Sequence, residues 1–215
     1  MQETAHPIPG RRLLGWLLAI FLFAVVPAIV LPTLVCRPED PALPHLGDVT
    51  AFALIDESRQ PFSEEALRGK VTIVNFVFTR CDTICPVLSM KMERIQDKTF
   101  DVGERLKLVS FSVDPKYDTP ERLAEFAKRY HAKPERWRFV TGEPDKVHHV
   151  IEKIFMTSMM QLPDRPSGAP DIAHGGYFLL IDPDLQIRGI YDSDRIHQLD
   201  ELMRDARYLV RTASR

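Results

Sequence analysis

The stretch from Val71 to Met92, VTIVNFVFTRCDTICPVLSMKM, constrains the fold more than any other part of the chain. Its first nine residues, Val71 to Thr79, are mostly apolar or β-branched, which is typical of a strand buried on both faces. Cys81 and Cys85 follow at once, and Pro86 comes next, a residue favoured in the first turn of a helix. Two thiols therefore stand where a strand leads into a helix, at the sheet edge where ligands and chemistry gather in α/β proteins.

Strand and helix patterns alternate through the rest of the chain. Thr119 and Pro120 are suited to begin a helix, with threonine as the N-cap and proline at the first helical position. The turn residues Asp182-Pro183-Asp184 lie between two apolar runs and predict a hairpin. The sequence therefore predicts an α/β, thioredoxin-like fold, with a central mixed sheet flanked by helices, a βαβ middle and two antiparallel final strands. Strands are predicted over 50–55, 71–79, 106–113, 137–141, 176–181 and 186–191, a helical turn over 63–67, and helices after residue 86 and over 120–131, 145–155 and 195–210.

Length and composition fit one domain with a smaller addition. The chain has 215 residues, of which 45% are hydrophobic, enough for one well-packed core but not for two large ones. The formal net charge of −2 is close to neutral, and nothing in the sequence points to nucleic acid as a partner.

The segment from Leu13 to Val35 contains no charged residue. It is long enough to cross a bilayer as a helix, which takes about 20 apolar residues. Arg11 and Arg12 precede it, so the positive-inside bias places residues 1–12 in the cytoplasm and the remainder across the membrane. A cleaved signal peptide is the alternative, although its apolar core is usually about 7–15 residues. We expect a transmembrane helix over 13–35, a single-pass anchor in the cell inner membrane with the soluble domain on the periplasmic side.

Cys36, at the end of the apolar run, has two interpretations. It is either a lipidated cysteine, for which Val35 is an unfavourable preceding residue, or a thiol that is buried or at the membrane edge. The residues that follow are rich in proline and lack periodicity, which predicts a linker over 36–48. The folded domain is then expected to span 49–215.

Cys81 and Cys85 are separated by three residues, unlike the two of dithiol oxidoreductases. Helical side chains four residues apart lie on one face with Cβ atoms about 5–6 Å apart, and in a loop before a helix two sulfurs can bond or share a metal. Two adjacent thiolates suit a soft ion such as Cu(I), and a helix N-terminus lowers thiol pKa, favouring metal binding and thiol exchange alike. The alternative is a pair of buried, inert cysteines, against which the polar neighbours Arg80, Asp82 and Thr83 argue.

A third ligand has to come from elsewhere, and histidine is the candidate. His174 ends a Pro/Gly-rich loop over 157–173, and in a thioredoxin-like fold that loop faces the thiol junction. Met156, Met159 and Met160 offer auxiliary Cu(I) contacts, although packing is the more common role of methionine. Most of the other histidines are expected to be ordinary surface residues: His6, His45, His131, His148, His149 and His197.

Several blocks, in order, resemble the Sco/SenC family of membrane-anchored, thioredoxin-like copper-binding proteins. The first two are FVFTRCDTICP, which resembles its T-x-C-P-x-x-C-P core, and FSVDPKYDTPERLAEFAKRY, which resembles its S-V-D-P-x-x-D-T-P block. WRFVTG resembles its L-T-G segment, and DIAHGGYFLLIDPDLQIRGIY resembles its D-H-x-x-x-x-x-L-I-D-P-x-G segment. The resemblance covers nearly all of residues 49–210 and includes the N-terminal anchor.

The resemblance implies a ligand set and a role. Copper, as Cu(I) or Cu(II), would be bound by Cys81, Cys85 and His174. The family acts in assembly of the dinuclear copper centre in subunit II of cytochrome c oxidase, as metallochaperone, thiol reductase or both. The partner is then expected to be that subunit or another copper enzyme.

The chain also departs from the family pattern. Asp82 and Thr83 stand where proline and aspartate are usual, and Ala173 stands where an aspartate is usual. Loss of the proline frees the loop between the cysteines and Asp82 adds charge beside them, so copper affinity and reduction potential are expected to shift. Two functions remain open: a copper metallochaperone, which uses His174, and a thiol–disulfide oxidoreductase, which needs only the cysteines. A peroxiredoxin-like peroxidase is a more distant third. We expect the two cysteines to form a reversible, redox-active disulfide in the metal-free protein.

Overall fold

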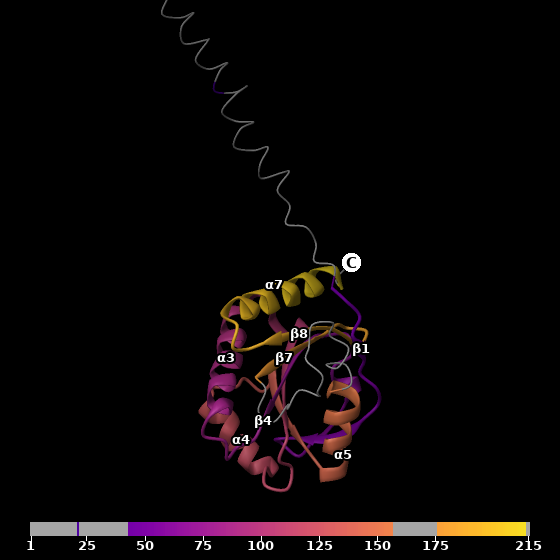
Figure 1. The fold of residues 1–215 in the computed structure, drawn as a ribbon, viewed down its shortest axis with the longest axis vertical. Coiled ribbons are helices and arrows are strands. Elements are labelled where there is room, and N and C mark those ends of the chain that lie inside the picture. The colour runs from indigo at the N-terminus through magenta and orange to yellow at the C-terminus, as the bar shows by residue number, and fades with distance from the viewer. Residues whose placement is uncertain (1–20, 22–42, 157–175, 214–215) are drawn as a thin grey trace, which may run out of the picture. The chain divides into compact units, whose positions relative to one another are not determined.

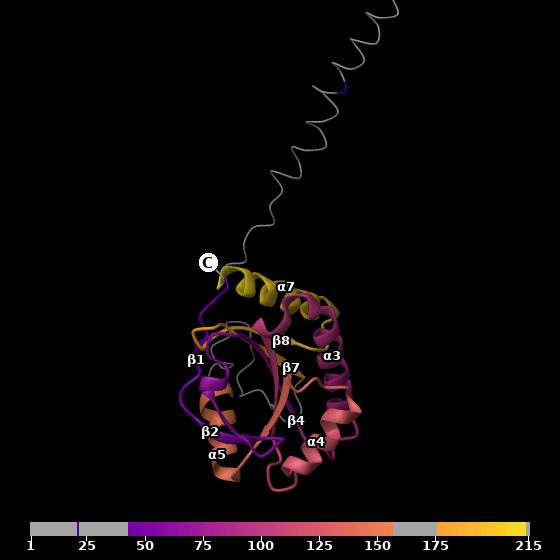
Figure 2. The same ribbon diagram turned by 180° about the vertical axis from the view of Figure 1, so that it is seen from behind.

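The computed structural model describes Phe21, residues 43–156 and residues 176–213. Within these ranges eight strands form one mixed sheet with helices on both of its faces (Figure 1, Figure 2). The strands are β1 (Gly47–Asp48), β2 (Ala53–Asp56), β3 (Pro61–Ser63), β4 (Val71–Val77), β5 (Leu106–Ser112), β6 (Trp137–Thr141), β7 (Tyr177–Ile181) and β8 (Gln186–Asp192). Their order in the sheet is β1-β8-β7-β4-β5-β6-β2-β3, and β4, β5 and β6 are parallel while every other neighbouring pair is antiparallel. The predicted parallel centre and antiparallel final hairpin are confirmed.

Helices connect the parallel strands and cover the sheet. The first long helix joins β4 to β5 and the next joins β5 to β6, which builds two successive βαβ units. Thr119 caps the second of these helices and Pro120 is its first residue, as predicted. The helical segments are η2 (Glu64–Ala66), α3 (Ile84–Lys98), η3 (Phe100–Arg105), α4 (Pro120–Arg129), α5 (Pro144–His149), the π-helix η4 (Val150–Met156) and α7 (Ile196–Thr212).

β4 is the central strand, and its composition explains its position. All seven of its residues are buried. It pairs along its whole length with β5, from Val71 opposite Leu106 to Val77 opposite Ser112, and with β7 on its other side. Its apolar and β-branched side chains suit a strand that packs on both faces. Because β4 ends at Val77, the residues that follow emerge at the carboxyl edge of the parallel strands.

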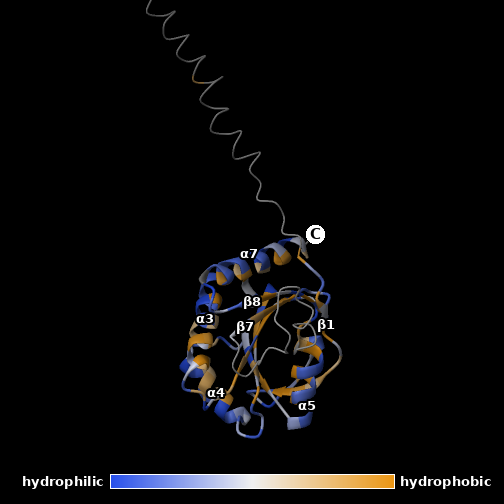
Figure 3. Cartoon of the chain, viewed as in Figure 1, coloured by the Kyte–Doolittle hydropathy of each residue, from blue (hydrophilic) through white to orange (hydrophobic). Residues whose placement is uncertain are grey.

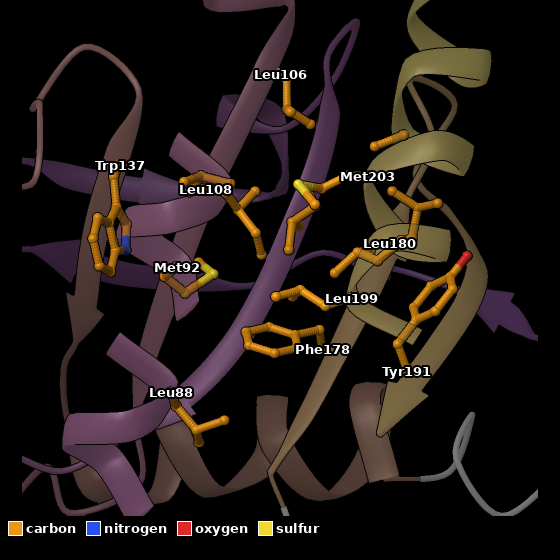
Figure 4. Packing of buried hydrophobic residues seen from close by; sticks show 14 of the residues in the cluster. Leu88, Met92, Leu106, Leu108, Trp137, Phe178, Leu180, Tyr191, Leu199 and Met203 are labelled. Carbon is orange, nitrogen blue, oxygen red and sulfur yellow. The ribbon is translucent and has the colours of Figure 1, made fainter. Parts of the chain in front are cut away.

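Alternation along the strands divides the core into two apolar clusters. On one face, Leu108 packs in a cluster with Leu88 and Met92 of α3, together with residues of α4 and α7 (Figure 4). On the other face, Val109 belongs to a cluster with Val147 of α5. Figure 3 shows hydrophobic residues concentrated on the central strands, whereas the helices carry both hydrophobic and hydrophilic residues. Each fully buried aliphatic side chain contributes about 1.5–3 kcal/mol, so both layers hold the sheet in place.

Two boundaries differ from the sequence prediction. Gly47 and Asp48 form β1 on β8, and Leu46 beside them is buried, so ordered pairing begins inside the segment 36–48 predicted as a linker. This pairing partner comes from the far end of the chain, and no local pattern signals it. The helix predicted over 145–155 is two segments, because α5 passes into the π-helix η4 at Val150.

Several predicted features lie outside the described residues. They are Cys36, the loop over 157–173, and the anchor over 13–35, of which only Phe21 is described. Among the described residues, no helix combines the length and hydropathy needed to cross a bilayer.

Candidate functional site

The two cysteines lie at the junction between β4 and α3. Cys81 is in the turn before the helix, where its backbone N–H donates to the carbonyl of Phe78 at 3.1 Å. Cys85 is the second residue of α3. The side chain of Cys85 is 2% exposed, whereas Cys81 is half-buried. Both are free thiols, and one faces the surface while the other faces the core.

The junction holds the two sulfur atoms together and favours the thiolate of Cys81. The backbone N–H of Cys85 donates to the Sγ of Cys81 at 3.4 Å, and the hydroxyl of Thr83 lies 3.6 Å from the same sulfur. Burial acts to raise the pKa of Cys81, but hydrogen bonds from Cys85 and Thr83 outweigh it and lower this pKa to about 7. A thiol with such a pKa is about half ionised at neutral pH and is an effective nucleophile or soft metal ligand.

The pKa of Cys85 is shifted in the opposite direction. Burial raises its pKa to about 12, and the hydrogen bond to Cys81, the charge of Cys81 and the charge of Asp118 all act in the same direction. A hydrogen bond from the Phe78 backbone opposes these effects but does not overcome them. Cys85 therefore stays protonated at neutral pH until a metal or a disulfide bond replaces its proton.

A buried carboxylate supports the junction from the neighbouring turn between β5 and α4. Asp118 is fully buried and accepts hydrogen bonds from the Thr79 N–H at 3.1 Å and the Thr79 hydroxyl at 2.6 Å. The Ser112 hydroxyl donates to its other oxygen at 2.6 Å. In the sequence, Asp118 is visible only as part of the block FSVDPKYDTPERLAEFAKRY, and its role as a hydrogen-bond acceptor for Thr79 is not. The available signal was a carboxylate beside a helix cap at the same sheet edge as the thiols.

His174, the predicted third ligand, lies outside the described residues, but the chain two residues later is placed. Gly176 stands against the first turns of α3 and the end of β8. A Cβ atom at Gly176 would lie 3.2 Å from side-chain atoms of both Ile84 and Leu88, and 2.2 Å from the Ser193 hydroxyl. Gly176, the first described residue after His174, therefore lies beside the helix that carries Cys85.

The other described histidines lie away from this junction in ordinary surface positions, as predicted. His45 contacts Asp48 at 2.9 Å, and His131 contacts Glu93 at 2.8 Å. The remaining three are exposed on helices: His148, His149 and His197. Within residues 43–156 and 176–213, no three His, Cys, Asp or Glu side chains group so as to hold a metal ion.

The family model described as SCO1/SenC matches residues 45–210 of the chain. The chain belongs to the SCO1/SenC family. A SCO1 protein homolog of Bacillus subtilis is 29% identical over 160 residues, covering 74% of this chain and 81% of that protein. A relative from Stutzerimonas stutzeri, named as a putative copper-binding protein, is 31% identical over 157 residues, covering 71% of this chain and 70% of that protein.

A solved structure confirms the fold of this SCO1/SenC protein. BsSco is described as a member of the Sco family of cytochrome c oxidase assembly proteins in which a disulfide switch was identified. It is 27% identical, has a TM-score of 0.64, and the match covers 80% of this chain and 96% of BsSco. The predicted thioredoxin-like α/β fold, with its mixed sheet flanked by helices, is confirmed.

Proposed function

We propose that the chain is a copper metallochaperone that binds one copper ion through Cys81, Cys85 and His174. It delivers the ion during assembly of a copper centre of cytochrome c oxidase, with subunit II or another copper enzyme as recipient. The observation that carries the proposal is the thiol pair at the β4–α3 junction, where the Cys85 N–H donates to the Cys81 sulfur. The family membership and the names of the relatives support the same ion and the same recipient.

The two thiols suit a soft ion that must be both bound and released. Cys81, half-buried and with a pKa of about 7, supplies a thiolate at the surface. Burial raises the pKa of Cys85 to about 12, so this thiol has to lose its proton when the ion binds. Copper affinity should therefore fall as pH falls through the neutral range, and more steeply below about 7, where Cys81 is protonated as well. Two thiolates and one neutral imidazole match Cu(I) in softness and leave an open side for transfer.

The position of Gly176 supports His174 as the third ligand. An extended chain advances at most about 3.6 Å per residue, so the Cα atoms of His174 and Gly176 are within about 7 Å of each other. A Cβ atom at Gly176 would lie 3.2 Å from the side chains of Ile84 and Leu88, so Gly176 lies beside the first turns of the helix that carries Cys85. The short connection from Gly176 back to His174 supports the imidazole as the third ligand of the thiol pair.

Copper titration of the anaerobic, reduced full-length protein tests the ligand set. We expect one equivalent of Cu(I) to bind in competition with a Cu(I) chelator. His174→Ala should weaken binding more than about a hundredfold, since even outer-shell partners of metal ligands are worth about 10–100-fold. Cys81→Ser and Cys85→Ser should abolish binding, because each removes a thiolate.

His148→Ala is the matched control, since His148 is exposed on α5 and is expected to leave copper affinity unchanged. Circular dichroism of each variant separates loss of the ligand from loss of the fold. If His174→Ala retains the parent affinity while Cys81→Ser loses it, the thiols bind copper without the histidine and the ligand set is wrong.

A thiol–disulfide oxidoreductase is the second candidate, favoured by the contrast between the two cysteines. The Cys81 thiolate would attack a client disulfide and release one client thiolate, forming a mixed disulfide. Cys85, losing its proton, would then attack the Cys81 sulfur and release the second client thiolate. The client gains two electrons and the protein keeps a Cys81–Cys85 disulfide. His174→Ala should leave this exchange unchanged, so client reduction without copper binding would place this function first.

We also propose that the segment over residues 13–35 anchors the domain on the periplasmic side of the inner membrane. The absence of charge in this segment and the preceding arginines support this topology. Reporter fusions at residue 40 should be active only with periplasmic reporters, and the full-length protein should resist alkaline extraction. Activity of a cytoplasmic reporter at that position would contradict the topology.

A further inference from the structure

A cavity of about 350 Å³ lies at the opposite end of the sheet from the two cysteines. Lys70 stands directly before β4, and Lys107 and Arg138 are the second residues of β5 and β6. All three line the cavity from the amino ends of the parallel strands. β4 has seven residues, which at about 3.3 Å per residue puts roughly 20 Å between this end and the thiol end. The cavity is therefore separate from the thiol site.

Strand register explains why these side chains meet on one face of the sheet. Lys107 lies opposite Thr72, which is two residues beyond Lys70, and Arg138 lies opposite Val109. Residues two apart in a strand point to the same face, so Lys107 and Arg138 project to one side, and Lys70, directly before β4, lines the same cavity. It is the side of the apolar cluster that includes Val109 and is covered by α5.

The cations of the cavity are unequally neutralised. Arg138 forms ion pairs with two carboxylates, one of them Asp56. Lys107 donates a hydrogen bond to the backbone carbonyl of Glu135, an exposed residue that also lines the cavity. Among the described residues, no ion pair joins the ammonium group of Lys70 or of Lys107 to a carboxylate. Two ammonium groups therefore face the cavity without a direct counter-charge.

Burial and the charge of Lys70 both act on the ammonium group of Lys107. Burial lowers the pKa of Lys107, and the charge of Lys70 lowers it further. The charge of Arg138 lowers it as well, whereas the charges of Glu104 and Glu135 raise it, and the pKa remains below its ordinary value. A bound anion would relieve this repulsion and favour both charged ammonium groups.

Apart from the three cations and the acidic residues Asp56 and Glu135, the residues that line the cavity are apolar. Phe62 and Leu67 line the cavity and are 6% and 0% exposed, and Val109 forms part of the floor. The volume is near the lower end of the range of about 300–1,000 Å³ for small-molecule sites. We propose that this cavity binds a small organic anion, with a doubly charged group such as a phosphate monoester held by Lys70 and Lys107 and an apolar substituent against Phe62 and Leu67. This site is independent of the proposed copper function.

Calorimetric titration of the full-length protein with phenylphosphate tests the site. We expect saturable binding of one equivalent that weakens as salt is added, because exposed charge pairs are screened. The double variant K70Q/K107Q should bind about tenfold more weakly or worse, since it loses two charge-assisted hydrogen bonds. Inorganic phosphate should bind more weakly than phenylphosphate, and phenol should show no saturable binding.

Lys128→Gln is the matched control, because Lys128 is an exposed lysine on α4, outside the cavity lining. Carbon-13 NMR of the lysine side chains in the parent protein gives a readout that needs no variant, since phenylphosphate should raise the pKa of Lys107. Absence of saturable phenylphosphate binding overturns the proposal. So does binding that is equal in K70Q/K107Q and the parent, or an unchanged pKa of Lys107 at saturating phenylphosphate.

Discussion

Two strand-to-helix junctions lie side by side at the carboxyl edge of the sheet, and they are built differently. The β5–α4 junction is closed by hydrogen bonds, with Asp118 accepting from Ser112 and Thr119 capping α4. The β4–α3 junction carries the thiols, and Thr83, the residue before α3, makes no side-chain capping bond. The stabilising groups are concentrated in one turn and the reactive groups in the other.

The connection between the junctions explains how the reactive one is held. Asp118 extends from the β5–α4 turn and accepts both the N–H and the hydroxyl of Thr79, two residues before Cys81. The uncapped start of α3 leaves backbone N–H groups free to stabilise a thiolate, as the bond from Cys85 to Cys81 does. The reactive β4–α3 junction is thus held in place by a carboxylate from the β5–α4 junction.

Asp118→Ala should remove the hydrogen bonds that connect the two junctions, and we expect it to have the largest effect on stability. It leaves the Thr79 N–H and the Ser112 hydroxyl without their buried acceptor, and we expect a loss of about 3–5 kcal/mol in the free energy of unfolding. It should also lower the pKa of Cys85, because the charge of Asp118 raises it. Urea denaturation and alkaline titration of thiolate absorbance measure the two effects.

Asp114→Ala is the control for this variant. Asp114 lies in the same turn but pairs with Arg80, whose side chain is 59% exposed, so its removal should cost no more than about 1 kcal/mol. Equal stability of the Asp114 and Asp118 variants would show that the buried carboxylate does not support the thiol junction.

Local features of the two junctions can be predicted from the sequence, whereas the contacts between them cannot. The Thr119–Pro120 cap and the β4 strand are local patterns, and both are confirmed. The bond between Asp118 and Thr79 joins residues 39 apart, and its existence depends on β4 and β5 lying in parallel register. The opposite burial of Cys81 and Cys85 likewise depends on how α3 packs, which the spacing of the two cysteines does not determine.

The cavity at the amino end of the parallel strands also depends on long-range pairing. Lys70 and Lys107 are unremarkable in the sequence, and only the register of β4 and β5 brings them to one cavity. Gly47–Asp48 forms a strand of two residues, too short for any periodicity to be visible. Long-range pairing, rather than local preference, decides each of these features.

Thr119→Ala and Thr83→Ala form a matched pair that compares the two helix starts. Thr119 accepts a hydrogen bond from the Arg122 N–H at 3.4 Å, so its replacement should lower the free energy of unfolding by about 1 kcal/mol. Thr83 makes no capping bond, and Thr83→Ala should change stability by less than about 0.5 kcal/mol. Denaturant unfolding measures both, and an equal loss in the two variants would contradict the contrast.

The smallest expected effect is on the ionisation of Cys81. Its pKa of about 7 predicts that the alkylation rate rises as pH increases through 7 and levels off well above it, while buried Cys85 reacts slowly throughout. Thr83→Ala removes one hydrogen bond that lowers this pKa, so the midpoint should move upward and the rate at pH 7 should fall roughly twofold. Thr119→Ala should leave the midpoint unchanged, since Thr119 does not contribute to the pKa of Cys81. A midpoint near the ordinary thiol value in the parent protein would mean that the uncapped helix start does not stabilise the thiolate.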